Sequence, residues 1–174
     1  MRLRPADPDD LELLRSWDKQ PHVVAANPND DCGWEVELGR YPAWREQLIA
    51  EIGGRPVGFV RIIDPALEES GYWGDVPPGL RAIDIWVGEG ADLGKGYGTE
   101  MMRLALARCF ADSAVFAVLV DPLANNLRAH RFYERLRFRF VERCRFGKDE
   151  CFVYRLDRCR YSRPSHPGAL SSLD

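Results

Sequence analysis

Clusters of metal-binding side chains are missing from this sequence of 174 residues. Its three histidines, His22, His130 and His166, lie far apart, and no two of its five cysteines form a CxxC pair. An odd number of cysteines without close spacing argues against both a disulfide framework and a zinc site. We therefore predict no bound metal, and reduced thiols as in a cytoplasmic protein.

Long apolar runs are also missing. No segment approaches the roughly 18 apolar residues that a membrane-spanning helix needs, and the first ten residues, MRLRPADPDD, lack the apolar core of a signal peptide. The net charge is only −3, and the arginines are interleaved with Asp and Glu. We therefore expect neither a membrane nor a nucleic acid as a partner.

The remaining composition is that of an ordinary globular protein, with 45% hydrophobic and 29% charged residues. The length is sufficient for one well-buried domain and too short for two comfortable ones. We predict a single domain over 1–158, followed by a tail over 159–174. The polar run from Ser162 onward, SRPSHPGALSSLD, is typical of disorder.

Hydrophobic periodicity predicts a mixed α/β domain around one largely antiparallel sheet. Two segments of low periodicity, 21–41 and 64–79, are expected as loops, the first with room for short helices. The predicted strands are 1–4, 47–52, 56–63, 81–88, 115–120, 138–145 and 150–156, and the predicted helices begin near Pro8 and cover 97–111 and 126–136. The helix at 97–111 is apolar around most of its circumference, which predicts burial.

A glycine-rich turn, Leu93-Gly94-Lys95-Gly96-Tyr97-Gly98-Thr99, joins the strand at 81–88 to the helix at 97–111. Glycine lets the backbone approach a ligand closely, and the free N–H groups at a helix start bind anions. The turn matches neither the GxxxxGK[ST] pattern of P-loops nor the GxGxxG pattern of dinucleotide-binding folds. By itself it fits either an anion site or a tight strand-to-helix connection.

The helix at 126–136 carries a second motif. It reads Asn126-Leu127-Arg128-Ala129, then Phe132-Tyr133-Glu134, with Phe138 beyond it. Together with the glycine turn and the strand between them, this motif resembles the GCN5-related N-acetyltransferase (GNAT) superfamily over roughly Met1 to Arg158.

Further segments resemble the aminoglycoside 6′-N-acetyltransferases within that superfamily. They are Pro21-His22-Val23-Val24, Tyr72-Trp73, Gly79-Leu80-Arg81-Ala82-Ile83-Asp84, Leu93-Gly94-Lys95-Gly96 and Asp121-Pro122. The sequence departs from the usual pattern at Ala25-Ala26-Asn27-Pro28, where paired aromatics are common, at Arg137 in place of a glycine, and at Leu93 in place of glutamine or arginine. The first departure bears on the substrate assignment, and the other two on local geometry.

The resemblance implies a sheet that splays at its centre, with helices on both faces and acetyl-CoA as cosubstrate. Its pantetheine arm would lie between the strands at 81–88 and 115–120, and its pyrophosphate on the N–H groups of 94–99. Asn126 would contact the arm, although an asparagine there can simply cap the helix. The expected cofactor-binding residues are Trp86, Val87, Leu93, Gly94, Lys95, Gly96, Tyr97, Gly98, Thr99, Asn126 and Ala129.

The resemblance also suggests catalytic roles. Asp84 interrupts an apolar strand where the acetyl group should lie, and would act as base or electrostatic anchor; it could instead pair with an arginine. Tyr133 is the candidate general acid for the departing thiolate, although it lies on the helix's apolar stripe and could belong to the core. A backbone N–H near Trp86 or Val87 would stabilise the oxyanion.

The expected substrate is a small polycationic amine, above all the 6′-amine of an aminoglycoside antibiotic, acetylated directly in a ternary complex. Its expected contacts are Tyr72, Trp73, Asp75, Asp84 and Asp121, with Glu68 and Glu69 nearby. Glu68, Glu69 and Asp75 could equally form a solvated loop. Acylation of another small amine, such as a hydroxylysine siderophore precursor, and a non-catalytic acyl-CoA sensor are the alternatives. The sequence leaves open monomer or homodimer, and the role of 21–41.

Overall fold

The computed structural model describes residues 1–29 and 32–161. Its strands are β1 (Arg2–Pro5), β2 (Arg45–Ile52), β3 (Arg55–Ile63), β4 (Leu80–Val87), β5 (Ala117–Val120), β6 (Arg139–Phe146) and β7 (Asp149–Asp157). They form one seven-stranded sheet in the order β1-β2-β3-β4-β5-β7-β6. β4 and β5 are parallel, and the other neighbouring pairs are antiparallel. The predicted mixed, mostly antiparallel sheet is confirmed.

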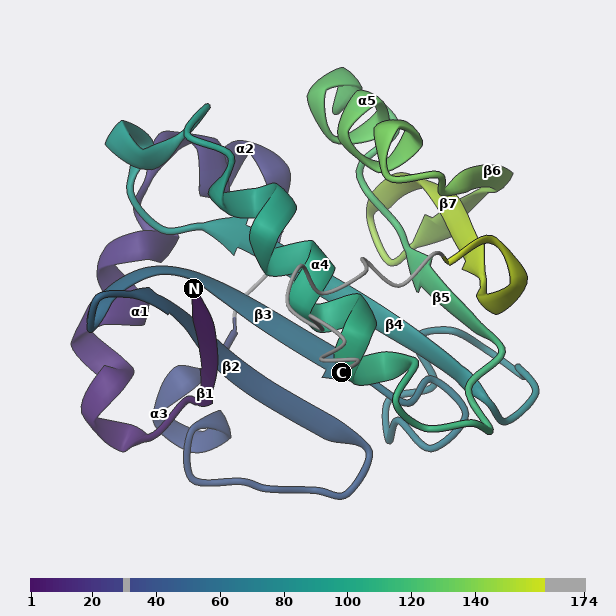
Figure 1. The fold of residues 1–174 in the computed structure, drawn as a ribbon, viewed down its shortest axis with the longest axis horizontal. Coiled ribbons are helices and arrows are strands. Elements are labelled where there is room, and N and C mark those ends of the chain that lie inside the picture. The colour runs from purple at the N-terminus through teal and green to yellow at the C-terminus, as the bar shows by residue number, and fades with distance from the viewer. Residues whose placement is uncertain (30–31, 162–174) are drawn as a thin grey trace, which may run out of the picture.

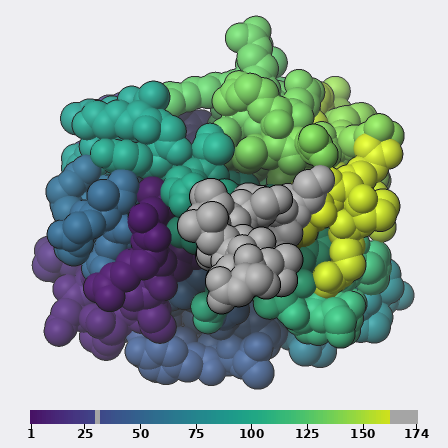
Figure 2. Space-filling view, viewed as in Figure 1, coloured from purple at the N-terminus to yellow at the C-terminus, as the bar shows by residue number. Residues whose placement is uncertain are grey.

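Helices cover both faces of the sheet (Figure 1). α4 (Tyr97–Cys109) and α5 (Leu127–Arg135) pack on one face, and α1 (Leu11–Asp18), α2 (Pro21–Ala26) and α3 (Trp34–Glu37) on the other. Figure 2 shows the first residues of the chain, in purple, and the residues leading up to 161, in yellow, on opposite sides of the molecule. No helix among the described residues combines the length and apolar character needed to cross a membrane.

The alternation of side chains along β4 separates two apolar cores. Ile83 packs with Met101 and Met102 of α4, whereas Trp86 packs with Trp34 of α3 on the opposite face. Gly88 allows α1 to approach the end of β4, because a Cβ there would lie 2.1 Å from the Trp17 ring. Burial on both faces therefore fixes the orientation of every β4 side chain.

β4 and β5 pair only at their first residues. The parallel register joins Leu80 to Ala117 and ends with Ala82 opposite Leu119, while β4 stays paired with β3 as far as Val87. Beyond Ala82 the two strands diverge, and Figure 1 shows β4 running behind α4 while β5 lies to the right of that helix. The predicted splay is confirmed. It leaves a gap between β4 and β5, where one edge of β4 has no neighbouring strand among the described residues.

Some details differ from the expectations. β5 begins at Ala117 rather than at 115, because the chain before it turns, with the Val115 N–H donating to the Asp112 carbonyl. α4 is buried on one face only and exposes Arg108, since the sheet lies on just one side of it. Residues 158–160 form a 3-10 turn, and the predicted disorder from Ser162 lies outside the described residues.

Candidate active site

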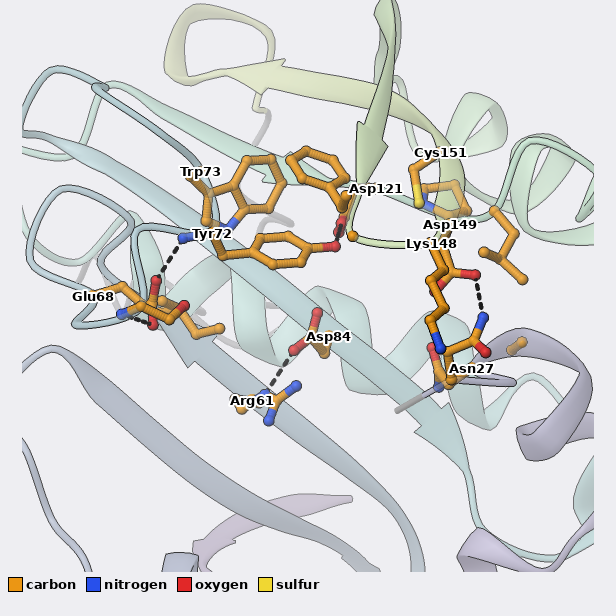
Figure 3. Close-up of a pocket in the computed structure, with 18 of the residues that line it drawn as sticks. Asn27, Arg61, Glu68, Tyr72, Trp73, Asp84, Asp121, Lys148, Asp149 and Cys151 are labelled. Atoms are coloured by element: carbon orange, nitrogen blue, oxygen red, sulfur yellow. Dashed lines mark hydrogen bonds and ion pairs between the residues drawn. The ribbon is translucent and has the colours of Figure 1, made fainter. Parts of the chain in front are cut away.

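A cavity of about 630 Å³ opens on the α1–α3 face of the sheet, next to the divergence of β4 and β5 (Figure 3). Its walls come from β3 and β4, the segment after α2, the loop at 64–79, the end of β5 and the β6–β7 turn. The polar and aromatic lining residues include Arg61, Glu68, Tyr72, Trp73, Asp84, Trp86, Asp121, Phe146, Lys148 and Asp149. Segments distant in sequence thus meet around one space.

Asp84 lies in this cavity, paired with Arg61 of the adjacent strand. The two residues are directly opposite in the β3–β4 register, and Arg61 Nε donates to Asp84 Oδ2 at 2.6 Å. Their side chains are 20% and 29% exposed, so a ligand in the cavity can reach both. The ion pair anticipated as an alternative for Asp84 is therefore present, and it lies inside the candidate site.

Asp121 follows the end of β5 and lines the same cavity as Asp84. Its Oδ2 accepts a hydrogen bond from the Tyr72 hydroxyl at 2.7 Å. Burial and the nearby charge of Asp84 raise the pKa of Asp121 to about 7. The carboxyl of Asp121 is therefore close to half ionised at neutral pH.

Three aromatic rings form one wall of the cavity. Tyr72 stacks on Phe146 of β6 with ring centroids 4.4 Å apart, and Trp73 meets Phe146 edge-on at 5.4 Å. Nearby, Asn29 Nδ2 donates to Asp149 Oδ1 at 2.6 Å, which joins the segment after α2 to the β6–β7 turn. The cavity is thus bounded by contacts between loops as well as by the sheet.

Tyr133 lies in the core on the other side of the sheet. It is 8% exposed on α5, and its ring contacts Phe132, Phe138 and Tyr154 in the α4–α5 core. Burial, together with the charges of Asp121 and Asp84, raises the pKa of the Tyr133 phenol above its usual range. Its proton is therefore retained at physiological pH, within electrostatic reach of both carboxylates.

The unpaired edge of β4 exposes alternate backbone amides. The Gly88 N–H donates to the Val57 carbonyl at 3.0 Å, and the ladder continues to Ile63–Ala82 in regular register. Since backbone N–H groups alternate in direction along a strand, the Trp86 N–H faces β3, whereas the Val87 N–H faces the gap. Of the two amides expected at the oxyanion, Val87 is the one whose N–H points away from β3. His22 Nε2 lies 2.8 Å from the Val87 carbonyl oxygen.

The glycine turn leads into the start of α4, beside this gap. Gly94 and Gly96 have φ values of 78° and 82°, and a Cβ on either would meet nothing within 4 Å. No side chain caps the N-terminus of α4. The N–H groups of its first turn have no capping side chain among the described residues, as an anion site requires.

A buried carboxylate anchors this turn. Asp92 accepts hydrogen bonds from Arg55 at 2.7 Å and from Lys95 at 2.9 Å, and these cations lower the pKa of Asp92 to about 2. Lys95, expected to contact the cofactor, is therefore also part of the support of the turn. Asn126 Oδ1 caps α5 by accepting from the Ala129 N–H at 3.1 Å, which leaves its NH₂ group to donate to a ligand.

Two expected acidic contacts lie elsewhere. Asp75 is exposed and does not line the cavity, because the chain turns at Gly74, with a φ of 67°. Glu69 pairs with Arg40 at 2.8 Å. For these two residues, the solvated-loop interpretation fits the structure better than substrate contact, whereas Glu68 does line the cavity.

Sequence reasoning did not identify Arg61, Phe146, Lys148 or Asp149 as site residues. Arg61 had a usable signal, because the predicted strands at 56–63 and 81–88 place it within reach of Asp84 if they pair. Phe146 ends β6, Lys148 lies in the turn that follows, and Asp149 begins β7, and their position at the cavity depends on long-range packing. No local sequence pattern marks that position.

The gap suits the acetyl-CoA expected from the sequence. Its pyrophosphate matches the free N–H groups at the start of α4, and its extended amide-bearing arm matches the unpaired amides of β4. When bound, acetyl-CoA supplies the acetyl group. Within the described part of the chain there is no cluster of side chains that could hold a metal ion.

Comparisons with known proteins agree with this geometry. Residues 7–146 match the family described as acetyltransferase (GNAT) domain. Aminoglycoside N(6′)-acetyltransferase type 1 of Klebsiella pneumoniae is 30% identical over 138 residues, which cover 74% of this chain and 69% of that protein. A kanamycin resistance protein of Rhizobium radiobacter is 38% identical over 73 residues, or 41% of this chain and 68% of that protein.

Solved structures share the fold. The aminoglycoside acetyltransferase AAC(6′)-Ib in complex with coenzyme A and kanamycin is 26% identical, with a TM-score of 0.81 and coverage of 93% of this chain and 97% of that one. An uncharacterised Bacillus halodurans protein has a TM-score of 0.80 at 14% identity, over 90% of this chain and 83% of that one, which is a likeness of fold alone. With the family match, the splayed sheet and the open helix start, the chain belongs to the GNAT acetyltransferase family and is an acetyl-CoA-dependent N-acetyltransferase.

Proposed function

We propose that this acetyltransferase acetylates the 6′-amine of an aminoglycoside antibiotic in the cytoplasm, and so confers resistance. The observation that carries the proposal is the cavity beside the β4–β5 gap, where Asp84 and Asp121 lie next to the aromatic wall of Tyr72, Trp73 and Phe146. Carboxylates and ring faces together suit a polycationic sugar. The names of the relatives and the kanamycin in the AAC(6′)-Ib complex support the same substrate class.

Each proposed role follows from position. Asp84 orients the substrate ammonium and accepts its proton directly or through water, since an ordinary aspartate is a weak base for an amine. The Val87 N–H stabilises the tetrahedral oxyanion. Gly94 to Thr99 hold the pyrophosphate, while Asn126 and Ala129 border the cofactor's arm.

Direct transfer in a ternary complex is favoured over a cysteine-bound intermediate. Cys151 lines the cavity, but burial raises the pKa of its thiol to about 12. A thiol that stays protonated is a poor nucleophile. The acetyl group is therefore expected to pass straight to the amine.

The experiment that tests the substrate is release of CoA by the purified protein with kanamycin, compared with glucosamine as a generic amine. We expect kcat/KM for kanamycin to be higher by about 100-fold or more, because glucosamine has too few charges to use the whole site. Asp84→Asn should reduce turnover by about 100-fold, and Asp75→Asn is the matched control. Equal rates with both amines would refute the substrate assignment.

The glycine turn can be tested without activity. A Cβ on Gly98 would lie 3.8 Å from both Phe132 and Val87, so the fold accommodates Gly98→Ala. The added methyl group narrows the space between Gly98 and these two side chains, which is the slot expected to receive CoA. We expect CoA to bind about tenfold more weakly by calorimetry, with an unchanged or higher Tm because alanine favours helix. Gly39→Ala, remote from the slot, is the control. Unaltered CoA affinity in Gly98→Ala would favour the tight-connection interpretation.

Tyr133→Phe removes the phenolic proton and keeps the ring. Because the raised pKa keeps the Tyr133 phenol protonated, it has a proton to donate as charge develops on the departing thiolate. We therefore expect kcat to fall by about 100-fold in Tyr133→Phe, with little change in CoA affinity. Tyr154→Phe, in the same core, should leave kcat unchanged. Equal kcat in the wild type and Tyr133→Phe would assign Tyr133 to packing.

Asp121 makes substrate affinity depend on pH. With a pKa of about 7, Asp121 is mostly neutral at pH 6 and mostly ionised at pH 8. Calorimetry should therefore show kanamycin binding about tenfold more tightly at pH 8 than at pH 6. Deprotonation of the amines of kanamycin would instead weaken binding as the pH rises, so tighter binding points to the protein. Asp121→Asn should lose this increase. An increase that persists in Asp121→Asn would assign it to another group.

A further inference from the structure

The Arg61–Asp84 pair lies on the wall of the cavity that the sheet forms. Both residues lie in the central strands, on the face that also carries Phe59 and Trp86, whose rings lie 4.7 Å apart. Figure 3 shows the guanidinium beside the Asp84 carboxylate, in the space that a ligand must enter. A cation that approaches Asp84 therefore meets the Arg61 guanidinium, which is already in contact with the Asp84 carboxylate.

The other carboxylates of the cavity have neutral donors. Asp121 accepts from the Tyr72 hydroxyl, Glu68 from the backbone N–H groups of Ser70 and Tyr72, and Asp149 from the Asn29 amide. A neutral donor leaves the charge of a carboxylate in place, whereas a guanidinium in contact with Asp84 cancels most of it. Asp84 thus differs from these acids in having a positively charged partner.

We infer that Arg61 is an internal counter-ion that occupies the ammonium site at Asp84 until a substrate amine displaces it, and that Arg61 lowers the affinity of this site for every amine. The inference rests on the proposed role of Asp84 in binding the reacting amine. Displacement imposes a similar cost on every amine. A molecule with one ammonium group gains little beyond Asp84, whereas a polycation offsets the cost through Asp121, Glu68 and Asp149. Arg61 therefore sets an affinity threshold, which an amine with several positive charges passes and an amine with one does not.

The test is the affinity of CoA-bound protein for kanamycin and for glucosamine, measured by calorimetry in wild type, Arg61→Gln and Arg61→Lys. We expect Arg61→Gln to bind both amines about tenfold more tightly, because the competing charge is gone. Arg61→Lys keeps a positive charge beside Asp84 and should stay near the wild type. Thermal unfolding of each variant checks that the sheet is intact.

Lys148→Gln is the matched control, since Lys148 is a second cation that lines the cavity but lies on the exposed β6–β7 turn. Removing its screened charge should tighten binding by less than about threefold. Unchanged or weaker binding in Arg61→Gln, an equal gain in Lys148→Gln, or no binding of either amine to Arg61→Gln would each overturn the inference. The proposed function fails separately, if wild-type turnover of kanamycin is no faster than that of glucosamine. Tighter binding in Arg61→Gln would uphold the counter-ion even then.

Discussion

The divergence of β4 from β5 is the constraint on which the site depends. Strands that separate after Ala82 leave backbone donors unpaired in the middle of a sheet, and buried donors need partners. The same divergence makes room for a ligand and places Asp84, Asp121 and Tyr133 around one point. Packing maintains it from both sides, with α4 on one face and Trp17, Trp34 and Phe59 on the other.

The negative charge of the cavity is smaller than its number of carboxylates implies. Four carboxylates line it, yet Asp84 is neutralised by Arg61, and burial keeps Asp121 half protonated near neutral pH. A strongly anionic well would bind many cations indiscriminately. Partial compensation instead makes affinity depend on how many charges a ligand brings and how they are spaced.

Most of the fold and part of the site could be predicted from sequence, because they depend on local patterns. A strand was predicted at 81–88 with Asp84 interrupting its apolar residues, and a helix after the glycine turn, and the structure has β4 and α4 there. Asp75 was expected in the site because it is an acid in the loop at 64–79. Composition does not show that the chain turns away from the cavity at Gly74. Lys148 and Asp149 were missed for the complementary reason, since only the sheet order brings their turn against the loop at 64–79.

The position of Asp121 has a consequence for the stability of the protein itself. In an unfolded chain this carboxyl would ionise near its ordinary pKa of 3.8, whereas in the folded protein its pKa is about 7. Folding therefore opposes its ionisation, and this contribution becomes progressively destabilising between about pH 4 and pH 7 and stays constant above that range. In the proposed complex an ammonium ion beside Asp121 would offset this penalty, so a cationic substrate would stabilise the native state most above about pH 7.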